Sequence, residues 1–322
     1  MRLSNKLRIL HKYIKKNNNI YIMGHSHLDL DAIASCLGLY EICIKMKKNP
    51  YIIINDKKHE AGVKKILDNV KGKYNIISNK DIKDKLFDKK DLLILADVNK
   101  PKITQAPDVC DKFKNIVVID HHEKNENSCS ASFEIVLSET SSTSEILTKF
   151  LYFYDIIIPK YISTCLLSGI VLDTNNFTVK TFSKTYLCAH YLMELGADNN
   201  EVQFLLKQDL DEYLLRQRVI TDTEIVNKNI AIAVGSQRLK YKREEIAKIA
   251  DTLLEFNHIE LSFVIAKLED GTIGISGRSI GKVSVGKILE YFNGGGDKYE
   301  AACKITDKSL REVEEELKEV IS

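Results

Sequence analysis

The first half of this 322-residue chain alternates short apolar segments with longer segments of helical periodicity. The apolar segments lie at residues 19–25, 50–56, 91–97 and 115–122, and the helical patterns lie at residues 32–46, 60–70, 144–154, 161–174 and 183–196. Strands that are apolar throughout and connected through helices are typical of a parallel sheet with helices on both faces. The alternation therefore predicts an α/β domain built on a parallel sheet.

The second half predicts a smaller domain of a different class. Residues 198–224 form a polar helical stretch without Gly, Pro or Ser, which indicates a helical connector. Beyond it, strand patterns lie at 229–236 and 261–279, and helical patterns lie at 243–256 and 283–292. The Asp270-Gly271 pair predicts a hairpin turn inside 261–279. We expect an α/β domain over residues 1–197, a connector over 198–224 and an α+β domain over 225–322.

Charge and cysteine content argue against several classes of protein. The 47 basic and 45 acidic residues give a net charge of +2, so no strong field for long nucleic acid or an anionic membrane is expected. The seven cysteines are scattered without a C-x-x-C pair, which disfavours a disulfide framework and a zinc knuckle. No apolar run reaches the roughly 18 residues that a membrane-spanning helix needs. We therefore expect a cytoplasmic protein with no membrane segment in this chain.

Carboxylates and imidazoles gather where strands of the predicted sheet should end. They fall in four groups along the chain: His25 with Asp29 and Asp31, then Asp97, then Asp120 with His121 and His122, and finally Asp173. Three of these groups directly follow an apolar segment. Because ligands of open α/β sheets bind outside the carboxyl ends of the strands, we expect these side chains to converge on one edge of the sheet.

Taken alone, each residue has a simpler interpretation. Asp31 could be the N-cap of a helix that begins at Ala32, and Asp97 could be an ordinary loop residue. The two histidines could be buried polar groups, and Asp173 could begin a turn. These separate interpretations explain the cluster as a whole poorly, because like charges collected at one edge repel one another unless cations neutralise them.

The types of side chain in the cluster indicate which cation would bind. Many carboxylates, few imidazoles and no thiolate favour Mn²⁺ or Mg²⁺ over zinc, with Co²⁺ as a further alternative. The candidate ligands suffice for two ions if one carboxylate bridges them: His25, Asp29, Asp31, Asp97, His121 and Asp173. Two such ions about 4 Å apart activate a water and stabilise an in-line displacement at phosphorus. The predicted reaction class is metal-assisted phosphoester hydrolysis.

These motifs resemble those of the DHH phosphoesterase superfamily. "GHSHLDLDA", "LADV", "IDHH" and "GIVLDT" occur in the family's order, and "GISGRSIGKVSVGKILEYFNGGGD" is similar to its DHH-associated substrate-binding domain. Connecting segments such as "FLLKQDLDEYLLR" resemble the cyclic-di-AMP phosphodiesterases of the GdpP type. Full-length members of that type carry membrane helices, a PAS-like sensor and a degenerate GGDEF domain before this core. The chain is thus either a stand-alone relative or the catalytic core of a longer protein.

The resemblance implies a role for each residue of the acidic and histidine cluster. It assigns one ion to His25, Asp29 and Asp97, and a second ion to Asp31, Asp97, His121 and Asp173. Asp97 would then bridge the two ions, and a bridging water would be the nucleophile. Asp120 would orient His121 through its other ring nitrogen, and His122 would lie beside the scissile phosphate.

The resemblance also implies substrate contacts in the C-terminal domain. Ser276, Arg278 and Ser279 match the family's substrate-contacting strand, and Gly294, Gly295 and Gly296 match its phosphate cradle. The next residue departs from the family, which has His where this chain has Asp297. An ionised Asp cannot donate a hydrogen bond and would repel a phosphate, at a cost of about 1–4 kcal/mol. Either Asp297 turns away while Lys298 supplies the cation, or it accepts from a sugar hydroxyl or adenine amino group, or the enzyme is weakened or has a shifted substrate.

The leading expectation is hydrolysis of cyclic di-AMP to linear pApA, with continuation to AMP left open. A first alternative is a nanoRNase or 3′-phosphoadenosine-phosphate phosphatase acting on short oligonucleotides, since such members of the superfamily use the same metal motifs. A second alternative is a weakly active cyclic-dinucleotide-binding protein, which Asp297 alone supports. Relatives suggest a homodimer.

Overall fold

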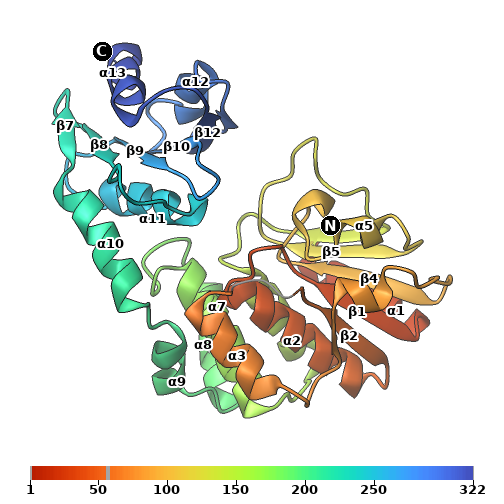
Figure 1. Cartoon of the computed structure of the whole chain (residues 1–322). Coiled ribbons are helices and arrows are strands. Elements are labelled where there is room, and N and C mark those ends of the chain that lie inside the picture. The colour runs from red at the N-terminus through yellow and green to blue at the C-terminus, as the bar shows by residue number, and fades with distance from the viewer. Residues whose placement is uncertain (1, 56–58, 322) are drawn as a thin grey trace. The chain divides into compact units, whose positions relative to one another are not determined.

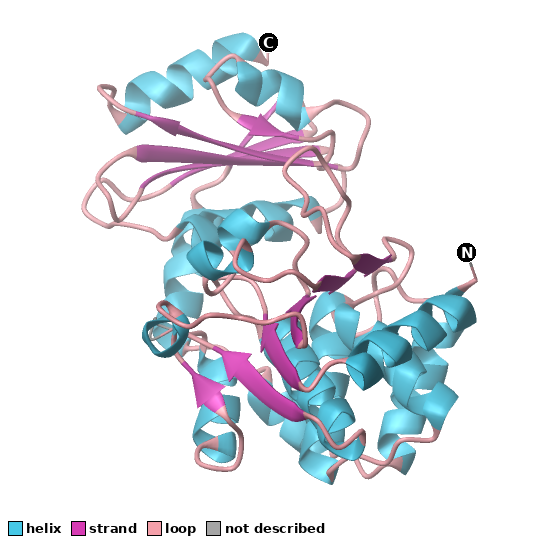
Figure 2. Ribbon diagram, turned by 90° about the vertical axis from the view of Figure 1, so that its right-hand side faces the viewer, coloured by secondary structure: helices cyan, strands magenta, loops and turns pink. Residues whose placement is uncertain are grey.

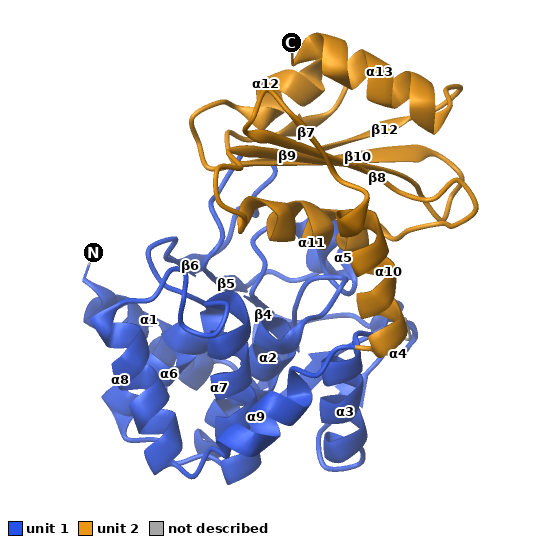
Figure 3. Ribbon diagram, turned by 90° about the vertical axis from the view of Figure 1, so that its left-hand side faces the viewer, with its two compact units in different colours: residues 1–208 blue, residues 209–322 orange. Residues whose placement is uncertain are grey.

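A computed structural model of the chain describes residues 2–55 and 59–321 and separates into two compact units (Figure 3). Unit 1 spans residues 1–208 and unit 2 spans residues 209–322. The boundary falls inside the predicted connector 198–224, between the helices α9 (Asn199–Leu205) and α10 (Leu210–Thr221). Asp56, the last residue of the predicted strand 50–56, lies outside the described residues.

Unit 1 is built on a six-stranded parallel sheet, as the apolar segments predict (Figure 1). Its strands are β1 (Asn19–Met23), β2 (Asn49–Ile53), β3 (Ile76–Ile77), β4 (Asp91–Ala96), β5 (Ile116–Asp120) and β6 (Phe133–Val136). They lie in the order β3-β2-β1-β4-β5-β6, and each pair of neighbours is parallel. The short strands β3 and β6 carry no clear apolar run and were not predicted.

Helices cover both faces of this sheet. They are α1 (Leu3–Lys16), α2 (Leu30–Lys45), α3 (Ala61–Val70), α4 (Asn79–Ile82), the 3-10 turn η1 (Pro101–Ile103), α5 (Pro107–Cys110), α6 (Thr143–Tyr154), α7 (Lys160–Asp173), α8 (Ser183–Glu194) and α9. Alternate strand residues point to opposite faces. Ile20 and Ile22 join the core beneath α2, α6 and α7, whereas Tyr21 and Met23 join the core on the α5 side.

The strand order places a crevice at one defined point of the sheet. β1 pairs with β2 on one side and with β4 on the other, so the order of addition reverses between β1 and β4. In open α/β sheets, ligands bind at such a reversal, outside the carboxyl ends of the strands. The segments that follow β1, β4 and β5 therefore border the expected site.

Helix α6 is fixed by a buried polar cluster close to this edge. The Ser142 hydroxyl caps the helix by accepting from the Glu145 backbone N–H at 3.1 Å. The buried Glu145 carboxylate accepts from the hydroxyls of Ser141 and Thr185, the latter at 2.9 Å, and pairs with Lys149. Burial alone would raise the pKa of Glu145, but Lys149 and Ser141 outweigh it, so the pKa is lowered.

Unit 2 contains a second six-stranded sheet, which is mixed. Its elements are α10, β7 (Glu224–Val226), β8 (Ile230–Val234), α11 (Arg243–Leu254), β9 (Leu261–Lys267), β10 (Ile273–Ser279), α12 (Val285–Glu290), β11 (Gly295–Gly296), β12 (Glu300–Ile305) and α13 (Leu310–Val320). The order is β11-β12-β10-β9-β8-β7, and only the β8–β9 pair of this sheet is parallel among the strands the structure describes. The β9–β10 hairpin turns at the predicted Asp270-Gly271.

The sheet of unit 2 also lies between two layers of helices (Figure 2). Val285 of α12 and Val313 of α13 belong to the core on one face, and Val219 of α10 and Ile249 of α11 belong to the core on the other. On β10, Ile273 and Ile275 point into the α12–α13 core. Because strand side chains alternate, Gly274, Ser276 and Arg278 face the α11 side.

We expect Glu145→Gln to lower the free energy of unfolding by about 2–4 kcal/mol at pH 7, because it removes the charge that satisfies the Lys149 ammonium and two hydroxyls. Since folding lowers the pKa of Glu145, its contribution is present above the unfolded-state pKa of about 4.3 and is lost as the pH falls through the lower folded-state value. Urea denaturation at pH 7 and at pH 3 measures both effects.

The matched control is Glu134→Gln, which breaks the exposed ion pair between Glu134 and Lys124. Exposed pairs contribute about 0–1 kcal/mol, so this variant should stay close to the parent protein. An equal loss of stability in the two variants would contradict the anchoring role of Glu145.

Candidate metal centre

The loop that follows β1 supplies the first group of the cluster. Asp29 is the N-cap of α2, and its Oδ1 accepts from the Ala32 backbone N–H at 2.9 Å. The interpretation of Asp31 as the N-cap is therefore wrong, because Asp31 lies in the first turn of the helix. The other oxygen of Asp29 lies 3.5 Å from His25 Nε2, so capping leaves it free to face the cluster.

Asp97 follows β4 and lies at the middle of the cluster. Its backbone N–H still donates to the Ile119 carbonyl at 2.9 Å, but its φ of +59° turns the chain out of the strand. The side chain is 2% exposed and uses its two oxygens in different directions. Oδ2 lies 3.5 Å from His25 Nε2, and Oδ1 lies 3.4 Å from His121 Nε2. One carboxylate thus connects two histidines that are far apart in the sequence.

The third group is at the end of β5 and differs in one detail from the expectation. Asp120 Oδ1 accepts from the backbone N–H groups of His121 and His122 and lies 2.8 Å from His122 Nδ1. Asp120 therefore orients the ring of His122 and not, as expected, the ring of His121. The Nδ1 atom of His121 is buried and has no hydrogen-bond partner among the described residues. The sequence could not distinguish these pairings, because a carboxylate at this position can reach either ring.

Asp31 and Asp173 complete the cluster. Asp31 is fully buried at the start of α2, and Asp173 is the last residue of α7. The Oδ2 atom of Asp173 lies 3.2 Å from His121 Nε2. Burial, and then the charges of neighbouring aspartates, raise the pKa of both carboxyl groups well above the usual range. The like charges are therefore poorly compensated by the protein's own groups.

The arrangement fits divalent cations. Each of three sets of side chains offers ligand atoms that all lie within 4.8 Å of one another: His25 with Asp29 and Asp97, Asp31 with His121 and Asp173, and Asp97 with His121 and His122. Asp97 belongs to two of these sets, and so does His121. Oxygen ligands with a minority of imidazoles suit Mn²⁺ or Mg²⁺. A cation would satisfy the buried Asp173 Oδ2, which accepts no hydrogen bond from the described residues.

Sequence reasoning missed the first turn of α6, which lies against the cluster. The backbone N–H groups of Thr143 and Ser144 donate to the two oxygens of Asp31, each at 2.8 Å, and the Thr143 hydroxyl donates to Asp97 Oδ1 at 3.1 Å. The segment "SSTSE" carries the N-cap signal for this helix. Nothing in that signal indicates that the helix begins at a carboxylate more than 100 residues away.

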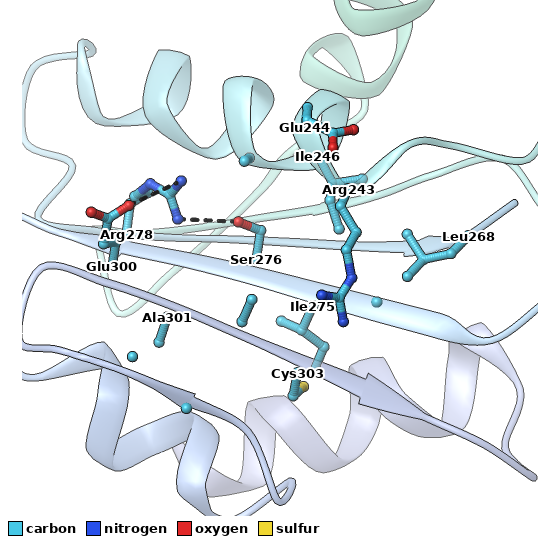
Figure 4. A pocket seen from close by; sticks show the side chains of 15 residues that line it. Arg243, Glu244, Ile246, Leu268, Ile275, Ser276, Arg278, Glu300, Ala301 and Cys303 are labelled. Carbon is cyan, nitrogen blue, oxygen red and sulfur yellow. Dashed lines mark hydrogen bonds and ion pairs between the residues drawn. The ribbon is translucent and has the colours of Figure 1, made fainter. Parts of the chain in front are cut away.

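Unit 2 holds a pocket of about 340 Å³ on the α11 face of its sheet (Figure 4). Ser276, Arg278, Gly295 and Gly296 are predicted substrate contacts that line it. Arg278 is already engaged there: Nε donates to Asp251 Oδ1 at 2.6 Å, Nη1 donates to Ser276 Oγ at 3.2 Å, and Nη2 lies 3.6 Å from Glu300. Arg243, which was not predicted, also lines the pocket.

Ser279 and Gly294 are not among the residues that line this pocket. The Ser279 hydroxyl donates to the Val283 carbonyl at 2.6 Å and accepts from the Gly281 backbone N–H, so it serves the turn after β10. A Cβ atom at Gly294 would lie 2.6 Å from Cys303 Cβ, and one at Gly296 would lie 2.2 Å from the Glu300 carbonyl oxygen. At Gly295 the same atom would meet nothing. Close packing of the β11–β12 hairpin therefore explains two of the three glycines.

Asp297 forms the turn of this hairpin. Its Oδ1 accepts from the backbone N–H groups of Tyr299 at 2.7 Å and Glu300 at 2.9 Å. Its backbone N–H donates to the Glu300 carbonyl, and its backbone carbonyl accepts from the Gly286 N–H. This is the local bonding that makes Asp a frequent turn residue. The assignment of Asp297 to substrate binding stays a prediction, but its carboxylate already accepts hydrogen bonds from two backbone N–H groups of the turn.

Among the described residues, none of the helices has the length and apolar character needed to cross a membrane.

Comparison with known proteins gives matches along most of the chain. The model of the DHH family, N-terminal domain, matches residues 19–170, and that of the DHHA1 domain matches residues 227–322. The chain is 34% identical over 314 residues to the cyclic-di-AMP phosphodiesterase PdeA of Listeria monocytogenes, covering 96% of this chain and 48% of that protein. It is 34% identical over 323 residues to the cyclic-di-AMP phosphodiesterase GdpP of Geobacillus thermodenitrificans, covering 97% and 48%. The chain thus spans about half the length of these relatives.

A solved structure shares the fold of the whole chain. An exopolyphosphatase-related protein from Bacteroides fragilis superposes with a TM-score of 0.80 at 23% identity, covering 98% of this chain and 96% of that one. At this identity the likeness concerns the fold alone.

We expect Asp97→Ala to weaken Mn²⁺ binding by at least about 100-fold at two sites together, because its carboxylate belongs to two of the ligand sets. Isothermal titration of the protein with Mn²⁺ gives the number of ions and their affinities. Asp108→Ala, which changes an exposed aspartate of α5, is the control and should match the parent. Retention of one ion with unchanged affinity would contradict a shared ligand.

We expect Asp297→Ala to lower the free energy of unfolding by about 1 kcal/mol, because two backbone N–H groups lose their acceptor. Asp297→Asn keeps an acceptor oxygen and should recover most of this loss. Urea denaturation of the three proteins measures the difference. If the Asn variant is as unstable as the Ala variant, the charge and not the hydrogen bonding of Asp297 supports the turn.

Proposed function

Because the chain belongs to the DHH family and joins a DHH domain to a DHHA1 domain, we propose that it is a metal-dependent phosphodiesterase that hydrolyses cyclic di-AMP to linear pApA. The observation that carries the proposal is the single carboxylate of Asp97 between two sets of metal-ligand side chains. The names of the curated relatives support the choice of substrate. The strand order supports the location, because the cluster lies at the carboxyl edge where the order of addition reverses.

The proposed centre binds two divalent ions, with Mn²⁺ as the first choice. The set of His25, Asp29 and Asp97 would hold one ion, and the set of Asp31, His121 and Asp173 would hold the other. Asp97 would join the second set through Oδ1, which lies 3.4 Å from His121 Nε2. When bound, such a pair supplies a water of lowered pKa and positive charge for the phosphate oxygens. The protein's part is to hold the ligands. The 2% exposure of Asp97 and full burial of Asp31 keep those carboxylates fixed and largely free of competing water.

His122 is the residue of the cluster best placed to meet a substrate. Its side chain is 55% exposed, whereas that of His121 is 7% exposed. Partial burial of the ring lowers the pKa of His122, but the neighbouring carboxylates of Asp120 and Asp97 outweigh it and, in the absence of metal ions, raise the pKa to about 9. With Nδ1 held by Asp120, Nε2–H would donate to a phosphate oxygen. His122 would thus position the phosphate and stabilise its charge.

The pocket of unit 2 would bind a planar or phosphate group of a nucleotide. Its lining on β10 and β12 consists largely of small side chains, among them Gly274, Ser276 and Ala302, which leave room for a planar group. Arg278 would offer a guanidinium to a phosphate. Its bonds to Asp251 and Glu300 hold that guanidinium in place, and they also reduce its free charge. We therefore expect Arg278 to contribute orientation more than attraction.

The test is a product profile with Mn²⁺ present, using cyclic di-AMP, cyclic di-GMP, linear pApA and 3′-phosphoadenosine phosphate. We expect pApA to appear from cyclic di-AMP, at a rate that a chelator abolishes and Mn²⁺ restores. The Asp97→Ala variant serves as the inactive control. Faster consumption of short RNA or phosphoadenosine phosphate would replace the proposal by the first alternative. Tight binding of cyclic di-AMP without turnover would replace it by a binding role.

A further inference from the structure

The first turn of α6 contacts two carboxylates of the metal-ligand cluster. Thr143 is the first residue of the helix and is fully buried. Its backbone N–H donates to Asp31 Oδ2 at 2.8 Å, and its hydroxyl donates to Asp97 Oδ1 at 3.1 Å. Asp31 and Asp97 lie on different segments of the sheet edge, at the start of α2 and after β4. A single residue therefore connects the two sides of the cluster.

The contact with Asp31 satisfies that carboxylate from the side of the helix. Its second oxygen accepts from the Ser144 N–H at 2.8 Å, so both oxygens are held by backbone groups at a helix N-terminus. These N–H groups have no partner within the helix, and the helix dipole adds positive charge at this end. Each carboxylate oxygen retains a second lone pair, which stays available for another ligand.

The contact with Asp97 has a different consequence. The oxygen that accepts from the Thr143 hydroxyl is the one 3.4 Å from His121 Nε2, while the other oxygen is 3.5 Å from His25 Nε2. The hydroxyl donor thus fixes the rotation of the carboxylate about its last bond. With that rotation fixed, one oxygen faces each histidine, as a bridging carboxylate requires.

A neighbouring glycine allows this arrangement. Gly169 of α7 lies so close that a Cβ atom there would be 2.5 Å from Ser144 Oγ and 2.8 Å from Asp31 Oδ1. Ser144 and Ser35 are also in contact, with their hydroxyl oxygens 3.4 Å apart. Helices α2, α6 and α7 therefore converge on Asp31, and the first turn of α6 has little room to shift.

We propose that Thr143 is a positioning residue of the metal centre, whose hydroxyl orients the Asp97 carboxylate so that it can serve two ions. The inference rests on the proposed metal centre of this DHH enzyme, but its test is metal binding and not activity. In this role Thr143 acts through Asp97 and is not itself a metal ligand. Its backbone N–H serves the separate contact with Asp31, so the hydroxyl can be removed by itself.

The experiment compares Thr143→Val and Thr143→Ser with the parent full-length chain. Valine removes the hydroxyl and keeps the shape and the N–H bond to Asp31, whereas serine keeps the hydroxyl. We expect Thr143→Val to weaken Mn²⁺ binding by about 10-fold or more, as changes of a residue that orients a metal ligand do, and Thr143→Ser to stay within about threefold of the parent. Titration calorimetry measures the affinity, and electron paramagnetic resonance reports the magnetic coupling of two bridged Mn²⁺ ions.

Thr148→Val is the matched control, since it removes another fully buried hydroxyl of α6, whose one partner among the described residues is the Ser144 carbonyl of the same helix at 2.7 Å. It should leave the Mn²⁺ affinity and the coupled spectrum unchanged. If Thr143→Val does not fold, Thr143→Ala against Thr143→Ser isolates the same hydroxyl without added bulk.

Three results would overturn the inference: parent-like affinity and coupling in Thr143→Val, an equal loss in the Val and Ser variants, or no binding of Mn²⁺ by the parent. A parent protein that binds two coupled ions but leaves cyclic di-AMP intact would refute the proposed substrate. In that case the Thr143 series would still decide the positioning role.

Discussion

The concentration of buried carboxylates at one edge of a parallel sheet is the constraint on which unit 1 depends. Asp31 and Asp97 are almost completely removed from water and lie near Asp29 and Asp173. Each negative charge therefore raises the free-energy cost of ionising the neighbouring carboxyl groups. Part of that free-energy cost is offset by histidine rings on one side of the cluster and by the first turn of α6 on the other. The rest of the negative charge is not compensated by the protein, and a pair of divalent ions would neutralise it.

The need to offset these buried charges explains why α6 begins and α7 ends at the carboxyl edge of the sheet that precedes them in the sequence. Asp173 closes α7 and Thr143 opens α6, so the C-terminal end of one helix and the N-terminal end of the other meet the strand ends. The N-terminal end favours the anion directly. The C-terminal end does not, and the buried Oδ2 atom of Asp173 accepts no hydrogen bond from the described residues. The difference between the two ends is what makes Asp173 suited to a cation.

The sequence predicts the part of the site that follows from strand ends, and fails where a contact depends on three-dimensional approach. Apolar runs with Asp or His at their ends located the cluster, because parallel strands share one carboxyl edge. The sequence allows Asp31 as the helix cap, because two nearby aspartates give the same signal, whereas in the structure Asp29, with its extended backbone, is the cap. The sequence does not indicate the role of Thr143, because its partners come from distant segments. Its local pattern is only that of a helix start.

The glycine run shows the same limit in unit 2. From the sequence, three glycines followed by Asp297 suggest an anion-binding cradle with an anion at its edge. In the structure, Gly294 and Gly296 are required by the approach of β12 and the end of α12, and the Asp297 carboxylate holds the turn that brings β12 back. The Asp297 carboxylate is therefore not a bare charge, since two backbone N–H groups already bind it. The expected repulsion between Asp297 and a phosphate is reduced by the same hydrogen bonds that give Asp297 its place in the fold.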